Sequence, residues 1–174
     1  VLAHKDISYI NMIATKNPEI NFYIHVDLKA NLDFSNSFEV PENIFFIKER
    51  VNVNWAGFSM VQATLNSLKF ALNHDEKNQY FHLISGDDVL LKSDLSWSDD
   101  TIYMECINSL AHRYRLRFNT PHADTKYLRS LLGKVLTQFY KFFDKLLPTQ
   151  ENFYFGSQWF SIRRNELKLI LNSI

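Results

Sequence analysis

The sequence contains little glycine or proline, a single cysteine, and no excess charge of either sign. Its 174 residues include four Gly, four Pro and Cys106, with 19 basic and 19 acidic side chains. A single cysteine cannot form an internal disulfide. Zero net charge gives no support for a nucleic-acid partner, which usually requires a basic surface. No stretch reaches the roughly 18 consecutive apolar residues of a spanning helix.

Aromatic side chains are abundant, with 15 Phe, eight Tyr and three Trp, and hydrophobic residues make up 46% of the chain. This is enough apolar mass for one globular core. Aromatic faces also bind sugar rings, but a packed core is the simpler explanation for most of the Phe residues. Val1 begins inside an expected strand and Ile174 ends inside an expected helix, so we expect a part of a longer chain.

Strand-like and helix-like segments alternate along the chain, which predicts an α/β fold with a mainly parallel sheet flanked by helices. Asp6 and Asp124 are expected helix caps. In the first expected helix Ile10 and Ile13 or Ala14 should face inward, and in the second Val61, Leu65, Leu68 and Leu72 form one apolar stripe. Nothing in the composition divides residues 1–174 into separate domains. The expected strands are 1–4, 21–26, 44–48, 80–85, 102–107 and 158–163, and the expected helices are 7–16, 57–74, 124–146 and 165–174.

Polar clusters follow four of the expected strands. They are His4-Lys5, His25-Val26-Asp27, Glu49-Arg50 and Ser85-Gly86-Asp87-Asp88. Ligands of open α/β sheets bind beyond the carboxyl ends of the strands. An isolated histidine there is more often structural, but four clusters at equivalent places favour a binding site.

The common phosphate-binding motifs and Cys/His metal clusters are absent from the sequence. Asp87-Asp88 can bind Mg²⁺ or Mn²⁺ through carboxylates, or simply cap a turn. The segment Asn54–Ser59 leads into the strongest expected helix, whose N-terminus attracts anions, with Ser59 as the expected N-cap. Packing of Trp55 in the core explains the same segment equally well.

Five motifs occur in order along the chain: VLAHKD, FYIHVDLK, RVNVNWAGFSMVQATLNSL, YFHLISGDDVLLKS and GSQWFSIRR. Together they resemble the core-2/I-branching β-1,6-N-acetylglucosaminyltransferase family, which shares its domain with peptide O-xylosyltransferases. The resemblance is strong over residues 1–94 and 156–164 and weak over residues 95–155.

The resemblance implies a GT-A-like, Rossmann-type fold. Residues 1–94 would form the nucleotide-sugar-binding half and residues 95–174 an incomplete acceptor-side half. It further implies an inverting transferase that moves a sugar, with GlcNAc the first choice, from a UDP-sugar to a hydroxyl of a glycan acceptor. Basic side chains rather than a divalent metal would stabilise the departing diphosphate, so no cofactor and no metal ligand are expected.

Site residues carry over from the matching motifs. Glu105 aligns only loosely, and Trp159 either stacks on a sugar or packs in the core. The general base of the family falls beyond Ile174. The implied donor-binding residues are Ala3, His4, Lys5, Asp27, Trp55, Ser59, Asp87 and Asp88, and the implied acceptor-binding residues are Glu105, Ser157 and Trp159.

Two alternatives remain open at this point. One is a UDP-xylose-dependent transferase, and the other is a truncated, non-catalytic piece that binds a sugar nucleotide. The loop with Pro121 and His122 resembles bacterial relatives. Because the chain also lacks a pair of cysteines for a disulfide, we expect the cytoplasmic side of a bacterial inner membrane, with peripheral membrane association, or the Golgi lumen for a eukaryotic source.

Overall fold

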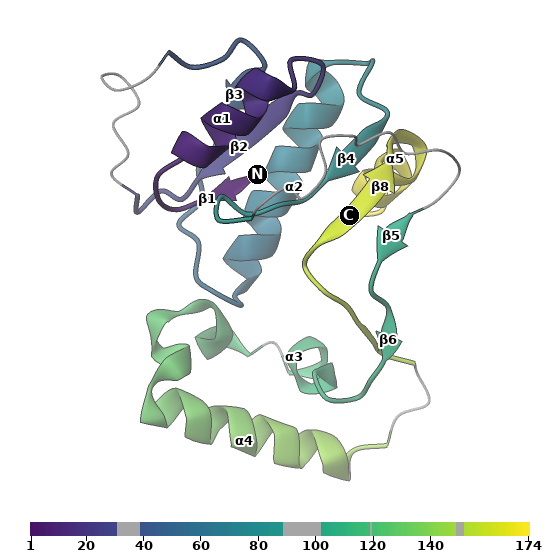
Figure 1. Cartoon of the computed structure of the whole chain (residues 1–174). Helices are drawn as coiled ribbons and strands as arrows, with labels where there is room; N and C mark the ends of the chain where they lie inside the picture. The colour runs from purple at the N-terminus through teal and green to yellow at the C-terminus, as the bar shows by residue number, and fades with distance from the viewer. Residues whose placement is uncertain (31–38, 89–101, 119, 149–151) are drawn as a thin grey trace.

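The computed structural model describes residues 1–30, 39–88, 102–118, 120–148 and 152–174 (Figure 1). The expected boundary between residues 94 and 95 lies outside them. The strands are β1 (Leu2–Ala3), β2 (Phe22–Val26), β3 (Ile44–Phe46), β4 (Tyr80–His82), β5 (Tyr103–Met104), β6 (Ile107–Asn108), β7 (Tyr154–Phe155) and β8 (Phe160–Arg163). The helices are α1 (Ser8–Lys16), α2 (Phe58–His74), α3 (Arg113–Arg117), α4 (Leu131–Leu146) and α5 (Arg164–Asn172), with 3₁₀ turns η1 (Pro121–Asp124) and η2 (Lys126–Arg129).

The first half of the chain forms the expected parallel sheet, in the order β1-β2-β3. The segment after β4 runs parallel to β1, because Leu2 N donates to Ile84 O (3.0 Å) and Gly86 N donates to Leu2 O (2.8 Å). On its other side β4 pairs antiparallel with β8, and β8 pairs antiparallel with β5. The α/β prediction is confirmed, and the antiparallel strands are an addition that the alternation of elements did not predict.

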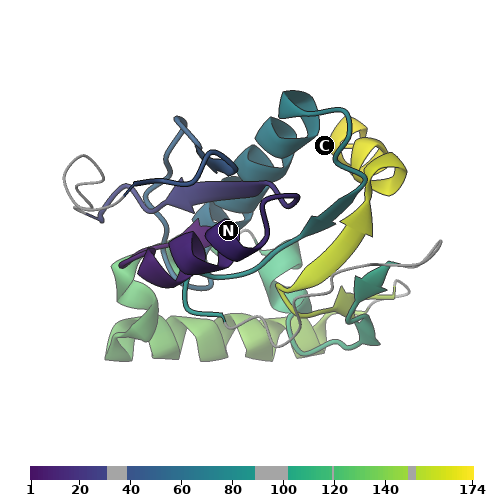
Figure 2. The same cartoon turned by 45° about the horizontal axis from the view of Figure 1, so that its top comes forward.

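Helices cover both faces of the sheet (Figures 1 and 2). Successive residues of a strand point to opposite faces, and β2 is buried along its whole length. Ile24 packs in one core with Ile10 and Ala14 of α1, whereas Tyr23 packs in a second core with residues of α2 and α5. The inward positions expected for α1 are therefore confirmed.

The apolar stripe expected on α2 is only partly buried. Val61 is 49% exposed, and Ala63, Ser67 and Ala71 are buried instead. Small side chains let the helix approach the sheet closely. The buried hydroxyl of Ser67 donates to Ala63 O of its own helix (2.7 Å), which satisfies it without a partner in the sheet. The stripe prediction is confirmed at Leu68 and Leu72, which are buried, and was wrong at Val61.

The strand expected over residues 102–107 is two strands. Met104 of β5 pairs with Phe160, whereas Ile107 of β6 pairs with Phe155 in a separate two-stranded sheet. The chain thus leaves one sheet and enters another between these two positions.

The helix expected to begin at Asp124 begins at Leu131. The side chain of Ser130 accepts a hydrogen bond from Gly133 N (3.1 Å) and forms its N-cap. Residues 121–124 and 126–129 form the 3₁₀ turns η1 and η2. The cap assigned to Asp124 was therefore wrong, and its carboxylate has a different partner, described below. Within the described ranges, no helix combines the length and apolar composition that a membrane crossing requires.

A buried ion pair joins α3 to α4. Arg113 Nε lies 2.9 Å from both carboxylate oxygens of Asp144, and its Nη2 donates to Asp144 O at 2.6 Å. Both side chains are 6% exposed. Two charges out of water are tolerated only with such complete hydrogen bonding, so this pair sets how α4 is rotated against α3.

We predict that Asp144→Ala lowers the free energy of unfolding by about 3 kcal/mol, because it leaves the Arg113 charge buried without its counter-ion. Urea unfolding followed by circular dichroism measures this. Gln138→Ala, at an exposed position of the same helix, is the matched control and should change stability by less than about 0.5 kcal/mol. Equal losses in the two variants would contradict the structural role of the pair.

Candidate functional site at the carboxyl ends of the strands

Three strand ends meet at one edge of the sheet. Asp27, directly after β2, donates its backbone N–H to Ala3 O at the end of β1 (2.8 Å). On the other side of β1, Gly86 N donates to Leu2 O (2.8 Å). The segments around Ala3, Asp27 and Gly86 are therefore neighbours, although they lie far apart in the sequence. This edge is where α/β folds bind their ligands.

Charged side chains of both signs lie where β1 and β4 end. Lys5 Nζ is 3.6 Å and His4 Nε2 is 3.9 Å from Asp87 Oδ2. All three side chains are more than half exposed, so water screens these contacts and they stabilise the fold little. They remain accessible to a ligand.

The two neighbouring aspartates have different surroundings. Asp88 Oδ2 accepts a hydrogen bond from Ser85 N (2.7 Å) and so caps the turn after β4. Asp87 instead lies beside Lys5 and His4. Over the described part of the chain, no group of three or more His, Cys, Asp or Glu side chains is placed to hold a metal ion.

Asp27 is held in one orientation by its own loop. Its Oδ1 accepts hydrogen bonds from Lys29 N (2.9 Å) and Val53 N (3.3 Å), and its Oδ2 lies 3.8 Å from Lys29 Nζ. The side chain is 13% exposed. This carboxylate thus ties the segment after β2 to the loop that leads into α2.

His25 has a structural role behind this edge. It is buried, and its Nε2 accepts a hydrogen bond from Val51 N (2.9 Å). Burial lowers the pKa of the imidazole below its usual value, which keeps that nitrogen unprotonated and able to accept. Arg50 donates to Val26 O and Asp27 O (3.1 and 2.7 Å). His25 and Arg50 belong to two of the polar clusters expected at the site, and they hold the backbone of the strand-end edge in place.

The N-terminus of α2 is occupied by a carboxylate of the protein itself. Asp124 Oδ2 accepts from Ser59 N (3.0 Å), and its Oδ1 accepts from Ser59 Oγ (2.6 Å). Asn54 Nδ2 donates to Asp124 O (2.9 Å). The N-cap residue is Gly57, without a side-chain cap of its own. The expectation that Ser59 is the N-cap was therefore wrong: Asp124, from a distant turn, takes that place.

Trp55 stands out from this loop. It is 68% exposed, so the alternative of a core tryptophan is wrong. The guanidinium of Arg129 lies 4.6 Å from the centre of its ring, a cation–π contact. The next residue, Ala56, has a positive φ of 60°, which is uncommon for a side chain larger than glycine.

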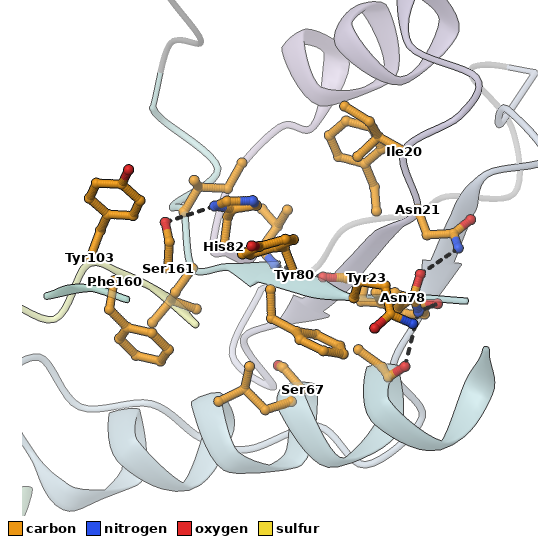
Figure 3. Close-up of a pocket in the computed structure, with 18 of the residues that line it drawn as sticks. Ile20, Asn21, Tyr23, Ser67, Asn78, Tyr80, His82, Tyr103, Phe160 and Ser161 are labelled. Atoms are coloured by element: carbon orange, nitrogen blue, oxygen red, sulfur yellow. Dashed lines mark hydrogen bonds between the residues drawn. The ribbon is translucent and has the colours of Figure 1, made fainter. Parts of the chain in front are cut away.

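A separate cavity of about 920 Å³ opens between β2 and β4 and reaches β5 and β8. Figure 3 shows Asn21, Tyr23 and Asn78 at one end and Tyr103, Phe160 and Ser161 at the other. Residues 21–23 begin β2, whereas Asp27 follows its end. The cavity thus lies away from the strand-end edge, and none of the implied donor-binding residues lines it.

The implied acceptor-binding residues lie together beside this cavity. Glu105 and Trp159 line it, and Trp159 is 41% exposed rather than packed in the core. A Cβ atom on Gly156 would lie 2.1 Å from Glu105 O, so only glycine allows this close approach. Ser157 Oγ accepts a hydrogen bond from Trp159 N (3.2 Å) but does not line the cavity.

The sequence model of Core-2/I-Branching enzymes matches residues 6–173. The chain belongs to the Core-2/I-branching enzyme family. It is also similar to a human protein named probable beta-1,3-galactosyl-O-glycosyl-glycoprotein beta-1,6-N-acetylglucosaminyltransferase 7, at 23% identity over 188 residues. That match covers 100% of this chain and 42% of the human protein.

In this member of the family, the sequence motifs did not indicate three residues that lie near the strand-end edge. Asp124 caps α2, Arg129 covers Trp55, and Lys29 faces Asp27. Lys29 lies two residues after Asp27, so a cation near that carboxylate could have been expected. Asp124 and Arg129 come from a part of the chain where the family resemblance is weak, and no local pattern indicates their partners.

We predict that stability falls as the pH drops below about 6.5, the ordinary pKa of histidine. The pKa of folded His25 is lowered by burial, so below that pH the unfolded chain binds the proton more readily and gains stability relative to the folded chain. Burial lowers the pKa values of His82 and His112 as well. These two histidines therefore act in the same direction.

Urea unfolding at pH 7.5 and 5.5 measures this dependence. His25→Gln, whose side-chain oxygen can accept from Val51 N, should be less stable at the higher pH and lose less stability on acidification. Because His82 and His112 remain in this variant, part of the dependence of stability on pH should remain as well. An unchanged pH dependence in the variant would show that His25 titrates as it does in the unfolded chain.

Proposed function

We propose that the chain binds a UDP-sugar at the carboxyl ends of β1, β2 and β4, as the donor-binding part of an inverting glycosyltransferase. The observation that carries this proposal is the convergence of Ala3, Asp27 and Asp87 at one sheet edge, with Lys5 and His4 beside them. Membership of the Core-2/I-branching enzyme family supports the same reaction class.

The chemistry of a sugar nucleotide fits the charges at this edge. A carboxylate held like Asp27 can accept hydrogen bonds from uracil or ribose donors. Lys5 and Lys29 are exposed cations that can approach the diphosphate, whose negative charge grows as it leaves the sugar. In the proposed reaction an acceptor hydroxyl gives its proton to a general base and attacks the sugar C1, and UDP departs from the opposite side.

We propose GlcNAc as the transferred sugar, because the similar human protein is named for an N-acetylglucosaminyltransferase. We further propose that the glycan acceptor approaches from the side of Glu105, Ser157 and Trp159, because these residues lie together where β5 and β8 pair. Trp159 offers a half-exposed ring on which a sugar face can stack. Xylose remains the second candidate for the donor sugar.

A second candidate function is sugar-nucleotide binding without transfer. Several carboxylates near the site already have partners: Asp88 caps a turn, and Asp124 caps α2. Glu166 pairs with Arg163, and hydrogen bonding from Arg163 lowers its pKa, which makes it a weak proton acceptor. Measurement of GlcNAc transfer and donor hydrolysis with this chain distinguishes the two functions.

We predict that millimolar UDP raises the melting temperature of the chain in the presence of EDTA. A ligand at about 100 times its Kd adds about 2.7 kcal/mol to stability, or roughly 5–10 °C for a domain of this size. Asp27→Asn should abolish this shift, because the neutral amide accepts fewer hydrogen bonds. Differential scanning fluorimetry measures both.

The matched control is Glu76→Gln, which removes one exposed carboxylate just beyond the C-terminal end of α2. It should keep the full shift. Comparison of the melting temperatures without UDP separates a lost site from a damaged fold. No shift of the wild-type chain with millimolar UDP would contradict the proposal, and a shift retained in Asp27→Asn would remove Asp27 from the site.

We predict that Asp87→Asn keeps or strengthens UDP binding in EDTA. The substitution removes a negative charge beside Lys5 and His4 and leaves these groups free to meet the phosphates. Isothermal titration of UDP with EDTA, and then with Mn²⁺, measures the effect. Binding that needs Mn²⁺ and is lost in Asp87→Asn would instead show that the aspartate holds a metal ion.

A further inference from the structure

Helix α4 exposes its apolar side. Leu131 is 83% exposed, Val135 65% and Phe142 58%. Residues three and four positions apart lie on one side of a helix, and the exposed apolar residues of α4 follow this spacing. We call them the α4 apolar face: Leu131, Leu132, Val135, Phe139, Phe142, Phe143 and Leu146.

The opposite side of α4 packs against the protein through polar and small residues and through Tyr140, whose ring contacts Phe118 and His122. Gly133 is buried, and a Cβ atom there would lie 2.1 Å from Tyr127 O. Thr137 Oγ1 lies 3.1 Å from His122 Nε2, and Asp144 pairs with Arg113. These contacts hold the helix with its apolar face outward. Figures 1 and 2 show α4 along the lower border of the molecule.

Basic residues form a third side of the same helix. Lys134, Lys141 and Lys145 are seven and four residues apart, which places them in one row beside the apolar face. The acidic residue of α4 is Asp144, which is buried in its ion pair. The exposed charges of the helix are therefore all positive, and they complement an anionic partner rather than an apolar or a basic one.

We propose that α4 binds the surface of a membrane that contains anionic lipids, with the helix lying in the plane of the surface. Its apolar face would enter the boundary between head groups and acyl chains, while its lysines meet the anionic head groups. Bulky Phe and Leu side chains beside a basic row are the composition of helices that bind in this way. The inference stands independently of the proposed sugar-nucleotide site.

Flotation of the full chain with vesicles tests the proposal. Vesicles of phosphatidylcholine with about one-third phosphatidylglycerol should carry the chain, and pure phosphatidylcholine vesicles should carry far less. The variant Phe139→Ser/Phe142→Ser should lower the partition coefficient about tenfold or more, because two aromatic rings no longer leave water. Leu169→Ser, at an equally exposed position of α5, is the matched control and should bind as the wild type does.

The variant Lys134→Gln/Lys141→Gln/Lys145→Gln tests the charges separately. It should bind anionic vesicles no better than neutral ones, and raised salt should weaken the wild type towards the same level. Lys134 and Lys145 are exposed, whereas Lys141 is half-buried with its Nζ 5.6 Å from the centre of the Tyr114 ring. The variant Lys134→Gln/Lys145→Gln therefore carries the test if the Phe variant loses its helical circular dichroism. UDP shifts measured in parallel should be the same in every variant.

Three outcomes would overturn the proposal. The first is a wild-type chain that does not float with anionic vesicles, and the second is flotation of both variants to the wild-type level. The third is a dimer in light scattering without vesicles that Phe139→Ser/Phe142→Ser dissociates. That result would assign the α4 apolar face to a second copy of the chain.

Discussion

The carboxylate of Asp124 at the start of α2 is the contact that joins the turn η1 to the loop leading into α2. It accepts hydrogen bonds from the backbone N–H and the hydroxyl of Ser59, and the side-chain amide of Asn54 donates to the backbone carbonyl of Asp124. A negative charge there also interacts favourably with the helix dipole. Gly57 makes the contact possible, because a Cβ atom would lie 2.0 Å from Asp124 Oδ1. The helix end that could have bound a phosphate thus already holds an anion, so the proposed function assigns the diphosphate to Lys5 and Lys29, which follow β1 and β2.

The other polar groups at the strand-end edge divide into two kinds. Buried ones satisfy backbone groups: His25 accepts from Val51, and Arg50 donates to carbonyls after β2. Exposed ones, such as Lys5 and Asp87, hold one another only through screened contacts. The buried groups fix the shape of the edge. The exposed groups can exchange their present partners for polar groups of a ligand. This division explains why four polar clusters at strand ends need not be four sets of binding residues.

The sequence predicted most of the fold but not its long-range polar contacts. The strand and helix order up to α2 follows from alternation and periodicity, and Ile10 and Ala14 face the core as expected. Helix α2 buries Leu68 and Leu72 as expected, but its N-terminal half buries Ala63 in place of Val61, because close packing favours small side chains. The cap of α2 lies 65 residues further on, at Asp124. No local pattern can indicate such a partner, since propensity and period describe only neighbouring residues.

Helix α4 shows what buried polar pairs contribute to a fold. If apolar burial alone decided its rotation, the row of Leu and Phe side chains would pack inward. The buried pair of Arg113 and Asp144, with the contact of Thr137 to His122, holds the opposite rotation. Replacing such a pair by apolar residues is often neutral for stability, so its contribution here is orientation. A chain that keeps a costly pair to hold Phe139 and Phe142 in water leaves them available for burial against a surface outside the fold.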